Sequence, residues 1–226
     1  MQKLAALLKK NIRPDFPTHY RKAFIVIGIV AFILFVLFTL LVRNDTLRSF
    51  DFDTTVRLQD DVPVRFDEIF SFFSIIGRFE FTFTVLLIIL FLKRKILGVA
   101  VIGFFGVAHI IEVIGKSILS QPGPPHMFLR TTDLSMKFPG LYVHTDASYP
   151  SGHSLRALFL FVIIFFILWG IKKLPAYLKY PTLAGLSIYT ILMLLSRVSL
   201  GEHWTTDVIG GALLGISFAF LSLLFL

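Results

Sequence analysis

The feature that most constrains this chain is an uncharged apolar run at residues 24–42. At about 1.5 Å of rise per residue, a helix of this length crosses a hydrocarbon core of about 30 Å. Over the whole chain, 56% of the 226 residues are hydrophobic, which is more apolar surface than a soluble domain of this size can hide. The sequence therefore predicts an integral membrane protein.

Further apolar segments predict an all-helical domain of six membrane spans at residues 24–226, preceded by a tail at residues 1–23. The later spans are expected at about residues 79–92, 96–119, 154–171, 181–195 and 206–226. Residues 66–76 are apolar but stop at Gly77-Arg78, and we expect a re-entrant or interfacial helix there. Gly210, Gly211 and Gly215 allow the last span to approach a neighbouring helix closely.

Charged residues set the expected orientation of the spans. The basic tail, Lys93-Arg94-Lys95 and Lys172-Lys173 fall on one face of the six-span layout, whereas the acidic residues 43–80 fall on the other. The positive-inside rule then places both termini in the cytoplasm and opens the loop at 120–152 to the extracytoplasmic side. The net charge of +8 is thus explained by membrane topology, and we expect no nucleic-acid partner. The tail itself fits either an interfacial helix or a solvated segment.

The polar stretch at residues 196–207 begins where an apolar segment ends. His203 and Asp207 are four residues apart, so on a helix they share one face. A carboxylate that accepts a hydrogen bond from one ring nitrogen leaves the other nitrogen free as a base or nucleophile. Alternatively, Asp207 only caps the start of a helix, a role that also suits Thr205 and Thr206.

A second polar stretch, residues 149–156, leads into the span at 154–171. Backbone N–H groups at the start of a helix bind anions, Ser151 adds a hydroxyl group, and Gly152 lets the backbone approach a ligand. His153 can protonate a leaving oxygen at the same place. A turn that carries an interfacial histidine is the alternative.

Three cations, Lys116, Arg156 and Arg197, lie in apolar surroundings near the expected outer face. Charges at membrane depth usually face the bundle interior or a polar cavity, and phosphate is a natural partner for arginine forks. Lys116 can instead snorkel or pair with Glu112, four residues earlier, and His109 shares that helical face.

Histidines and aspartates on the outer side do not form a recognisable metal motif. The residues concerned are His126, His144, His153, His203, Asp133, Asp146 and Asp207. Their spacing matches no compact zinc site, and no carboxylate cluster suggests magnesium. We therefore expect no metal or other cofactor, and the absence of cysteine excludes disulfides and thiolate chemistry.

The run Pro150-Ser151-Gly152-His153 resembles the second signature of the type 2 phosphatidic acid phosphatase (PAP2) superfamily. Ser196-Arg197, followed after five residues by His203 and after three more by Asp207, resembles the third. The resemblance implies a metal-independent membrane phosphatase in which His203 is the nucleophile that forms a phosphohistidine. It also implies that Asp207 orients His203, and that His153 is the general acid. The phosphate-binding residues that it implies are Lys116, Ser151, Gly152 and Arg197.

The first signature departs from the family pattern. After Lys116 and six further residues the chain has Gly123-Pro124, where the family has Arg-Pro. Arg156 lies about one helical turn beyond His153, and we hypothesise that it replaces the missing arginine from a different helix. Pairing of Arg156 with Glu112 or Glu202 is the alternative.

The function that these residues predict is hydrolysis of a lipid phosphate or pyrophosphate that enters sideways from the cell membrane. For a bacterial chain, undecaprenyl pyrophosphate and phosphatidylglycerophosphate are the expected substrates. A lipid phosphotransferase that uses the same site, or a lipid-binding protein with an impaired site, are the alternatives. Candidates for substrate contact in the loop at 120–152 are His126, Arg130, Lys137 and His144, each of which is otherwise a solvated polar residue.

Overall fold

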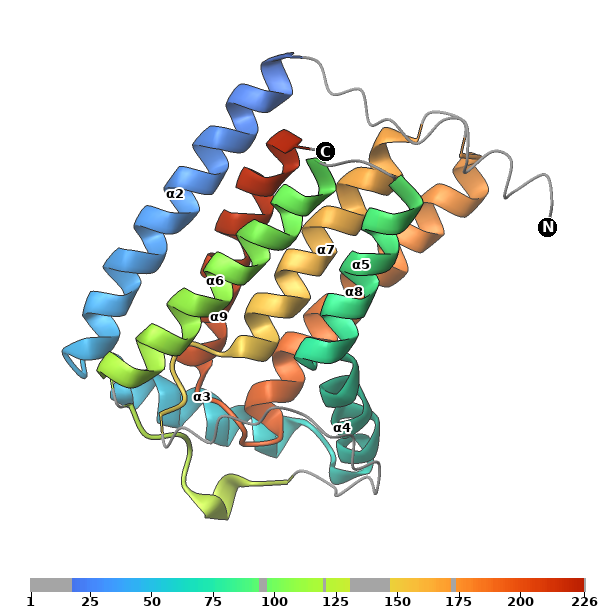
Figure 1. The fold of residues 1–226 in the computed structure, drawn as a ribbon. Helices are drawn as coiled ribbons and strands as arrows, with labels where there is room; N and C mark the ends of the chain where they lie inside the picture. The colour runs from blue at the N-terminus through green and yellow to red at the C-terminus, as the bar shows by residue number, and fades with distance from the viewer. Residues whose placement is uncertain (1–17, 94–96, 120, 131–146, 172–173, 226) are drawn as a thin grey trace.

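The computed structural model describes residues 18–93, 97–119, 121–130, 147–171 and 174–225, and these residues form a bundle of helices (Figure 1). Five helices form the long axis of the bundle: α2 (Thr18–Arg43), α6 (Leu97–Leu119), α7 (Gly152–Gly170), α8 (Ala176–Ser199) and α9 (Thr205–Ser222). Each is long and apolar enough to cross a membrane. The predicted all-helical, multi-pass membrane fold is thereby confirmed.

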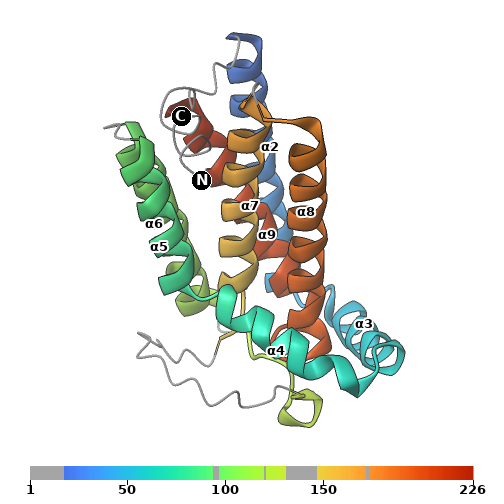
Figure 2. The ribbon, with the colours of Figure 1, turned by 90° about the vertical axis from the view of Figure 1, so that its right-hand side faces the viewer.

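Helices α4 (Asp67–Ile76) and α5 (Phe79–Lys93) form a bent pair. Their axes differ by 50°, and the break falls at Gly77-Arg78, where the sequence predicts it. Helix α5 runs beside α6, whereas α4 turns across the end of the bundle (Figure 2). Counted as one broken span, the pair brings the number of crossings to the six that were expected.

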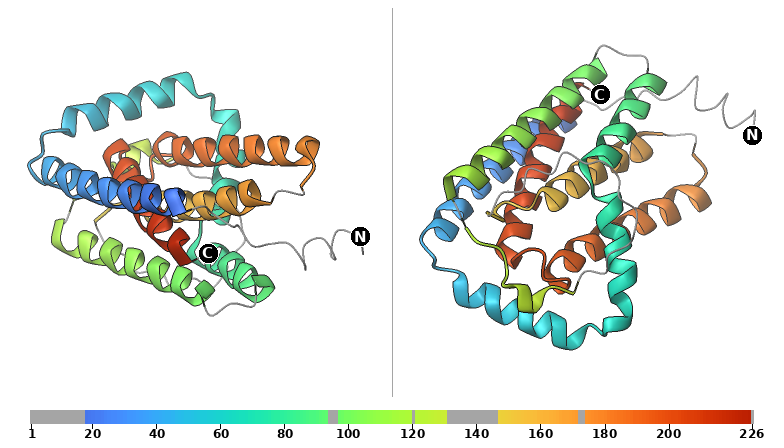
Figure 3. Two further views of the ribbon diagram at one scale, coloured as in Figure 1. Left: turned by 90° about the horizontal axis from the view of Figure 1, so that it is seen from above. Right: turned by 60° about the horizontal axis from the view of Figure 1, so that its bottom comes forward.

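One end of the bundle carries both polar stretches, and we call it the site end: α5, α7 and α9 begin there, and α6 and α8 end there. Helix α3 (Arg48–Asp61) and α4 border this end (Figure 3, right). The sequence analysis missed α3 because its charged residues form no apolar stripe, and only Asp51 and Thr55 are buried. Three short 3₁₀ turns complete the described elements: η1 (Val64–Phe66), η2 (His126–Phe128) and η3 (Leu223–Phe225).

Helices α7 and α9 cross closely at the centre of the bundle. A side chain at Gly211 would meet the carbonyl oxygen of Ser151, and one at Gly215 would meet that of Leu155. This confirms the predicted close approach. It also holds the starts of α7 and α9 against each other, which brings the two polar stretches together.

Helix boundaries differ from the prediction at two places. Helix α8 begins at Ala176 and includes Pro181, which the sequence analysis took as the start of the span. Pro181 is the sixth residue of the helix and cannot donate to the carbonyl oxygen of Tyr177, so α8 continues through this position with one backbone hydrogen bond fewer. Helix α2 begins at Thr18, inside the expected tail, and the rest of that tail lies outside the described residues.

Candidate active site

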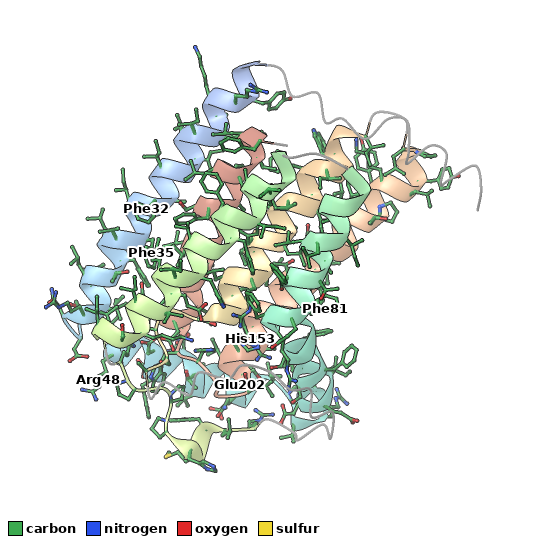
Figure 4. All side chains as sticks on the ribbon, viewed as in Figure 1. Phe32, Phe35, Arg48, Phe81, His153 and Glu202 are labelled. Atoms are coloured by element: carbon green, nitrogen blue, oxygen red, sulfur yellow. The ribbon has the colours of Figure 1, made fainter. Side chains whose placement is uncertain are left out.

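The imidazole rings of His153 and His203 meet at the site end. Their centroids lie 6.5 Å apart and the ring planes are inclined at 58°. His153 lies in the first turn of α7 (Figure 4), whereas His203 lies in the connection between α8 and α9. The Nε2 atom of His153 is buried and has no hydrogen-bond partner among the described residues. The structure therefore brings together two titratable rings that are 50 residues apart in the chain.

Asp207 contacts His203 and also caps helix α9. Its Oδ2 atom lies 3.4 Å from Nδ1 of His203 and accepts a hydrogen bond of 2.9 Å from the backbone N–H of Trp204. The carboxylate is fully buried. The structure therefore shows Asp207 as a cap of α9 and places the same carboxylate beside His203.

The two polar stretches are joined through Ser151, the N-cap residue of α7. Its backbone N–H donates to the carbonyl oxygen of Asp207 at 2.9 Å. Its hydroxyl oxygen accepts from the N–H of Ser154 at 3.4 Å, as in an ordinary helix cap. This hydrogen bond joins the first turn of α7 to the first turn of α9.

Glu112 of α6 balances the cations next to His153. Its Oε1 atom lies 2.9 Å from Nζ of Lys116, and its Oε2 atom lies 2.7 Å from Nδ1 of His109 and 3.7 Å from a terminal nitrogen of Arg156. A side chain at Gly152 would overlap this carboxylate. The Glu112 carboxylate thus lies at the helix start where the sequence analysis expected a phosphate.

Arg156 lies between Glu112 and the break in the α4–α5 pair. Its Nε–H donates to the carbonyl oxygen of Gly77 at 2.9 Å. Of the two carboxylates considered for it, the structure places Glu112 near Arg156, whereas Glu202 pairs with Arg197. Gly77 also makes room for the catalytic candidate, because an ideal Cβ there would lie 2.9 Å from Cδ2 of His153.

Arg197 is fully buried at the end of α8 and has several partners. Its guanidinium pairs with Glu202, donates to the hydroxyl of Ser74 at 2.8 Å and to the hydroxyl of Ser196 at 3.0 Å. Its carbonyl oxygen accepts from the backbone N–H of His203 at 3.1 Å. Arg197 therefore fixes the connection that carries His203 as well as presenting charge at the site.

Asp51 of α3 holds the first turn of α9, which sequence reasoning did not foresee. One carboxylate oxygen accepts from the N–H of Thr206 at 2.8 Å, and the other accepts from its hydroxyl at 2.6 Å. Burial raises the pKa of this carboxyl. The two residues are 155 positions apart and no local motif links them. No sequence signal pointed to this contact, because the buried residues of α3, Asp51 and Thr55, are both polar and form no apolar stripe.

The loop residue Arg130 stabilises the site end. Its guanidinium donates to Asp67 at 3.0 Å and to the carbonyl oxygens of Gln59 and Val62 at 2.9 and 3.1 Å. Among the other candidates for substrate contact, His126 is exposed on η2. Lys137 and His144 lie outside the described residues.

Potential metal ligands do not cluster in the part of the chain that the structure describes. Within it, no group of three or more histidine, aspartate or glutamate side chains is placed to hold a metal ion. Positive charge at the site instead comes from Lys116, Arg156 and Arg197.

Comparison with known sequences relates the chain to membrane phosphatases. Undecaprenyl-diphosphatase of Sulfolobus acidocaldarius is 31% identical over 136 residues, which are 60% of this chain and 58% of that protein. Phosphatidylglycerophosphatase B of Bacillus subtilis is 27% identical over 161 residues, which are 69% of this chain and 72% of that protein. The match to the archaeal relative thus leaves much of that protein uncovered.

Two solved structures share the fold. A PAP2-type phosphatidylglycerolphosphate phosphatase from Bacillus subtilis has a TM-score of 0.68 and 22% identity, over 86% of this chain and 93% of that one. LpxE of Aquifex aeolicus has a TM-score of 0.55 and 25% identity, over 76% of this chain and 93% of that one. The model of the PAP2 superfamily matches residues 95–226, which are more than half of the chain and contain both histidine motifs. The protein therefore belongs to the PAP2 superfamily.

Proposed function

We propose that the protein is a membrane phosphatase that hydrolyses a lipid phosphate or pyrophosphate through a phosphohistidine on His203. The observation that carries the proposal is the approach of the His153 and His203 rings, whose centroids lie 6.5 Å apart. Catalytic groups act over hydrogen-bond distances of about 2.6–3.2 Å. Two rings at this separation can therefore contact opposite sides of one phosphate group.

His203 attacks phosphorus in the first step. Asp207 accepts a hydrogen bond from Nδ1–H of His203, which keeps Nε2 unprotonated and nucleophilic. The new N–P bond forms as the bond from phosphorus to the leaving oxygen breaks, and His153 donates a proton to that oxygen. In the second step His153 removes a proton from water, and the resulting hydroxide displaces His203 and releases inorganic phosphate.

The phosphate is held by Ser151 and Gly152 at the start of α7, by Arg197 and by Lys116. Arg156 supplies the charge that Gly123 cannot, because one of its terminal nitrogens lies 2.8 Å from the position of a Cβ at Gly152. In this proposal the phosphate takes the place of Glu112, which lies near Arg156 in the structure. A guanidinium donates along fixed directions that match phosphate oxygens. These cations make a metal ion unnecessary, so we propose metal-independent hydrolysis.

The names of the relatives support the class of substrate. One relative is an undecaprenyl-diphosphatase and another a phosphatidylglycerophosphatase. Undecaprenyl pyrophosphate and phosphatidylglycerophosphate are therefore the first substrates to test. By the positive-inside rule the site end faces the extracytoplasmic side and both termini face the cytoplasm.

Phosphate release from the purified protein tests the function. The assay presents each lipid alone in detergent, with and without EDTA, and compares the wild type with His203→Ala. We expect release that EDTA does not affect and that falls below about one thousandth in the variant, as when other enzymes lose their nucleophile. Arg57→Ala, which changes an exposed residue of α3 at the same end, is the control.

Three outcomes of this assay would contradict the proposal in different ways. Release that requires a second lipid as acceptor would indicate a phosphotransferase. Loss of activity with EDTA would indicate a metal-dependent site. Lipid binding without phosphate release, and without a phosphorylated His203 in samples quenched rapidly in alkali and read by mass spectrometry, would indicate a protein that binds lipid without turnover.

A further inference from the structure

A cavity of about 200 Å³ lies between α5, α7 and α8, on the membrane side of the site. Its lining is mostly apolar and consists of Gly77, Phe81, Thr82, Val85, Ala157, Leu160, Phe161, Ile164, Leu186, Tyr189 and Thr190. The hydroxyl of Thr190 donates to the carbonyl oxygen of Leu186 at 2.8 Å, so its polar group is satisfied within α8. We call this cavity the α5–α7–α8 groove.

Helix α7 forms the floor of the groove. Ala157, Leu160 and Ile164 lie on one face because they are spaced by three and four residues. Helices α5 and α8 lie on either side of α7 and form the two walls (Figure 2). From Ala157 to Ile164 the floor extends about 10 Å along the helix, at about 1.5 Å per residue, away from the site end.

Gly77 separates the groove from the charged residues of the site. Its carbonyl oxygen accepts the hydrogen bond from Nε–H of Arg156 at 2.9 Å, and its missing side chain leaves space for the ring of His153. Ala157 follows Arg156 directly in the sequence. Phe81 on one wall and His153 are both labelled in Figure 4. The apolar surface thus ends where the cations and the candidate acid begin.

We propose that the α5–α7–α8 groove binds the hydrocarbon chain of the lipid substrate next to its phosphate. The inference rests on the proposed function and adds to it the place where the hydrocarbon chain of the bound lipid lies. A lipid phosphate needs an apolar surface directly beside its anion site, and the groove provides one at membrane depth. The larger cavity of about 470 Å³ lies beside α3 and the segment 121–125, beyond the membrane-spanning parts of the helices, and its lining includes the charged side chains of Arg48 and Asp51.

Filling the groove tests the proposal through the length of the substrate tail. Leu186→Trp places a large ring in the groove, whereas Ile188→Trp places the same ring on the exposed face of the same helix, where Ile188 is 59% exposed. The substrates are dioleoyl and dihexanoyl phosphatidic acid in one detergent. Because each buried methylene contributes to binding, we expect Leu186→Trp to raise KM for the dioleoyl lipid by about tenfold or more. KM for the dihexanoyl lipid should stay within about twofold.

If Leu186→Trp changes KM equally for the two lipids, or changes it for neither, the groove does not bind the hydrocarbon chain. The same conclusion follows from an increase in KM of the same size in Ile188→Trp. Failure of the wild type to release phosphate from these two lipids, from undecaprenyl pyrophosphate and from phosphatidylglycerophosphate would count against the proposed function instead. If the two phosphatidic acids are not hydrolysed, the groove is tested by binding alone. For that purpose a phosphatidic acid with a diazirine at mid-chain is cross-linked to the wild type. Enrichment at residues 157–164 and at Leu186, Tyr189 and Thr190 over the outward residue Ile188 supports the groove, and equal labelling contradicts it.

Discussion

At the scale of single residues, the charge on Glu112 determines how the site holds its cations. The carboxylate is 5% exposed and contacts Lys116, His109 and Arg156. Because it lies at the start of α7, next to Gly152, it takes the place that a bound anion would prefer. Glu112 thus keeps the cations paired while no phosphate is bound.

Changing Glu112 to Gln keeps the size of the side chain and removes the charge. Breaking a buried ion pair typically costs about 3–5 kcal/mol, so we expect a lower unfolding temperature in detergent. Inorganic phosphate can supply the missing negative charge, and it should raise the unfolding temperature of the variant more than that of the wild type. Glu80→Gln, at an exposed position in α5, is the control. Equal shifts with phosphate in variant and wild type would show that the anion does not bind there.

Arg156 and Gly123 can be tested as a pair. Arg156→Ala should lower kcat/KM by about 10²–10³-fold, the usual effect of losing one preorganised donor to a developing charge. Arg57→Ala, an exposed arginine of α3, should have little effect. Adding Gly123→Arg to Arg156→Ala should restore part of the activity, because the arginine then returns to its place in the first signature. A Cβ at Gly123 meets Ser148 Cβ at 3.5 Å, an ordinary contact, so the first atom of a side chain causes no overlap there.

Near-normal kinetics of Arg156→Ala would rule out its role in phosphate binding. A double variant that stays as inactive as Arg156→Ala, with an unchanged unfolding temperature, would show that the two positions do not serve the same phosphate.

At the scale of elements, α3 holds the first turn of α9 in place through hydrogen bonds to Thr205 and Thr206. Asp51 accepts two hydrogen bonds from Thr206, and the hydroxyls of Thr54 and Thr205 lie 2.7 Å apart. Since Asp207 belongs to the same turn of α9, these contacts fix the carboxylate that faces His203. Helix α3 therefore positions the site from outside the membrane spans.

Removing the contact between Asp51 and Thr206 should lower the turnover rate more than the affinity for substrate. Asp51→Ala deletes a cap of α9, which typically costs about 0.5–2 kcal/mol of stability. We expect a lower kcat with little change in KM, because Asp51 acts through its hydrogen bonds to Thr206. Asp53→Ala, an exposed aspartate of the same helix, should change neither parameter. A purely structural role would lower the unfolding temperature and leave the kcat of the folded fraction unchanged.

The sequence predicted the features that depend on residues close together in the chain and missed the contacts between distant segments. The spans were predictable because each depends on its own apolar composition, and the His109, Glu112 and Lys116 cluster because it repeats along one helix. The approach of His153 and His203 followed from the family resemblance, not from spacing. The pairs Asp51–Thr206 and Arg130–Asp67 were not predictable, since each joins segments more than 60 residues apart. The role of Gly77 was hidden too, because a glycine that makes room for His153 looks the same as one that breaks a helix.

At the scale of the whole molecule, the charge distribution of the loops determines which side of the membrane the site faces. Turn η2 lies beyond the site end, whereas α8 begins at the opposite end of the bundle (Figure 1). Lys179 follows that start, and acidic residues of α3 and α4 lie at the site end. Basic loops are retained in the cytoplasm, so the two ends should be accessible from different sides.

Single cysteines can test this orientation without background labelling, because the natural chain contains none. Met127 on η2 is 81% exposed and Tyr177 near the start of α8 is 75% exposed, so both positions should tolerate cysteine and react readily. We expect a membrane-impermeant maleimide to label Met127→Cys in intact cells and Tyr177→Cys only after the membrane is opened. Labelling of Tyr177→Cys alone in intact cells would reverse the orientation, and the lipid phosphate would then reach the histidines from the cytoplasmic leaflet. Phosphate release in detergent would be the same for either orientation. The labelling experiment therefore tests which side of the membrane the site faces, independently of the reaction that it catalyses.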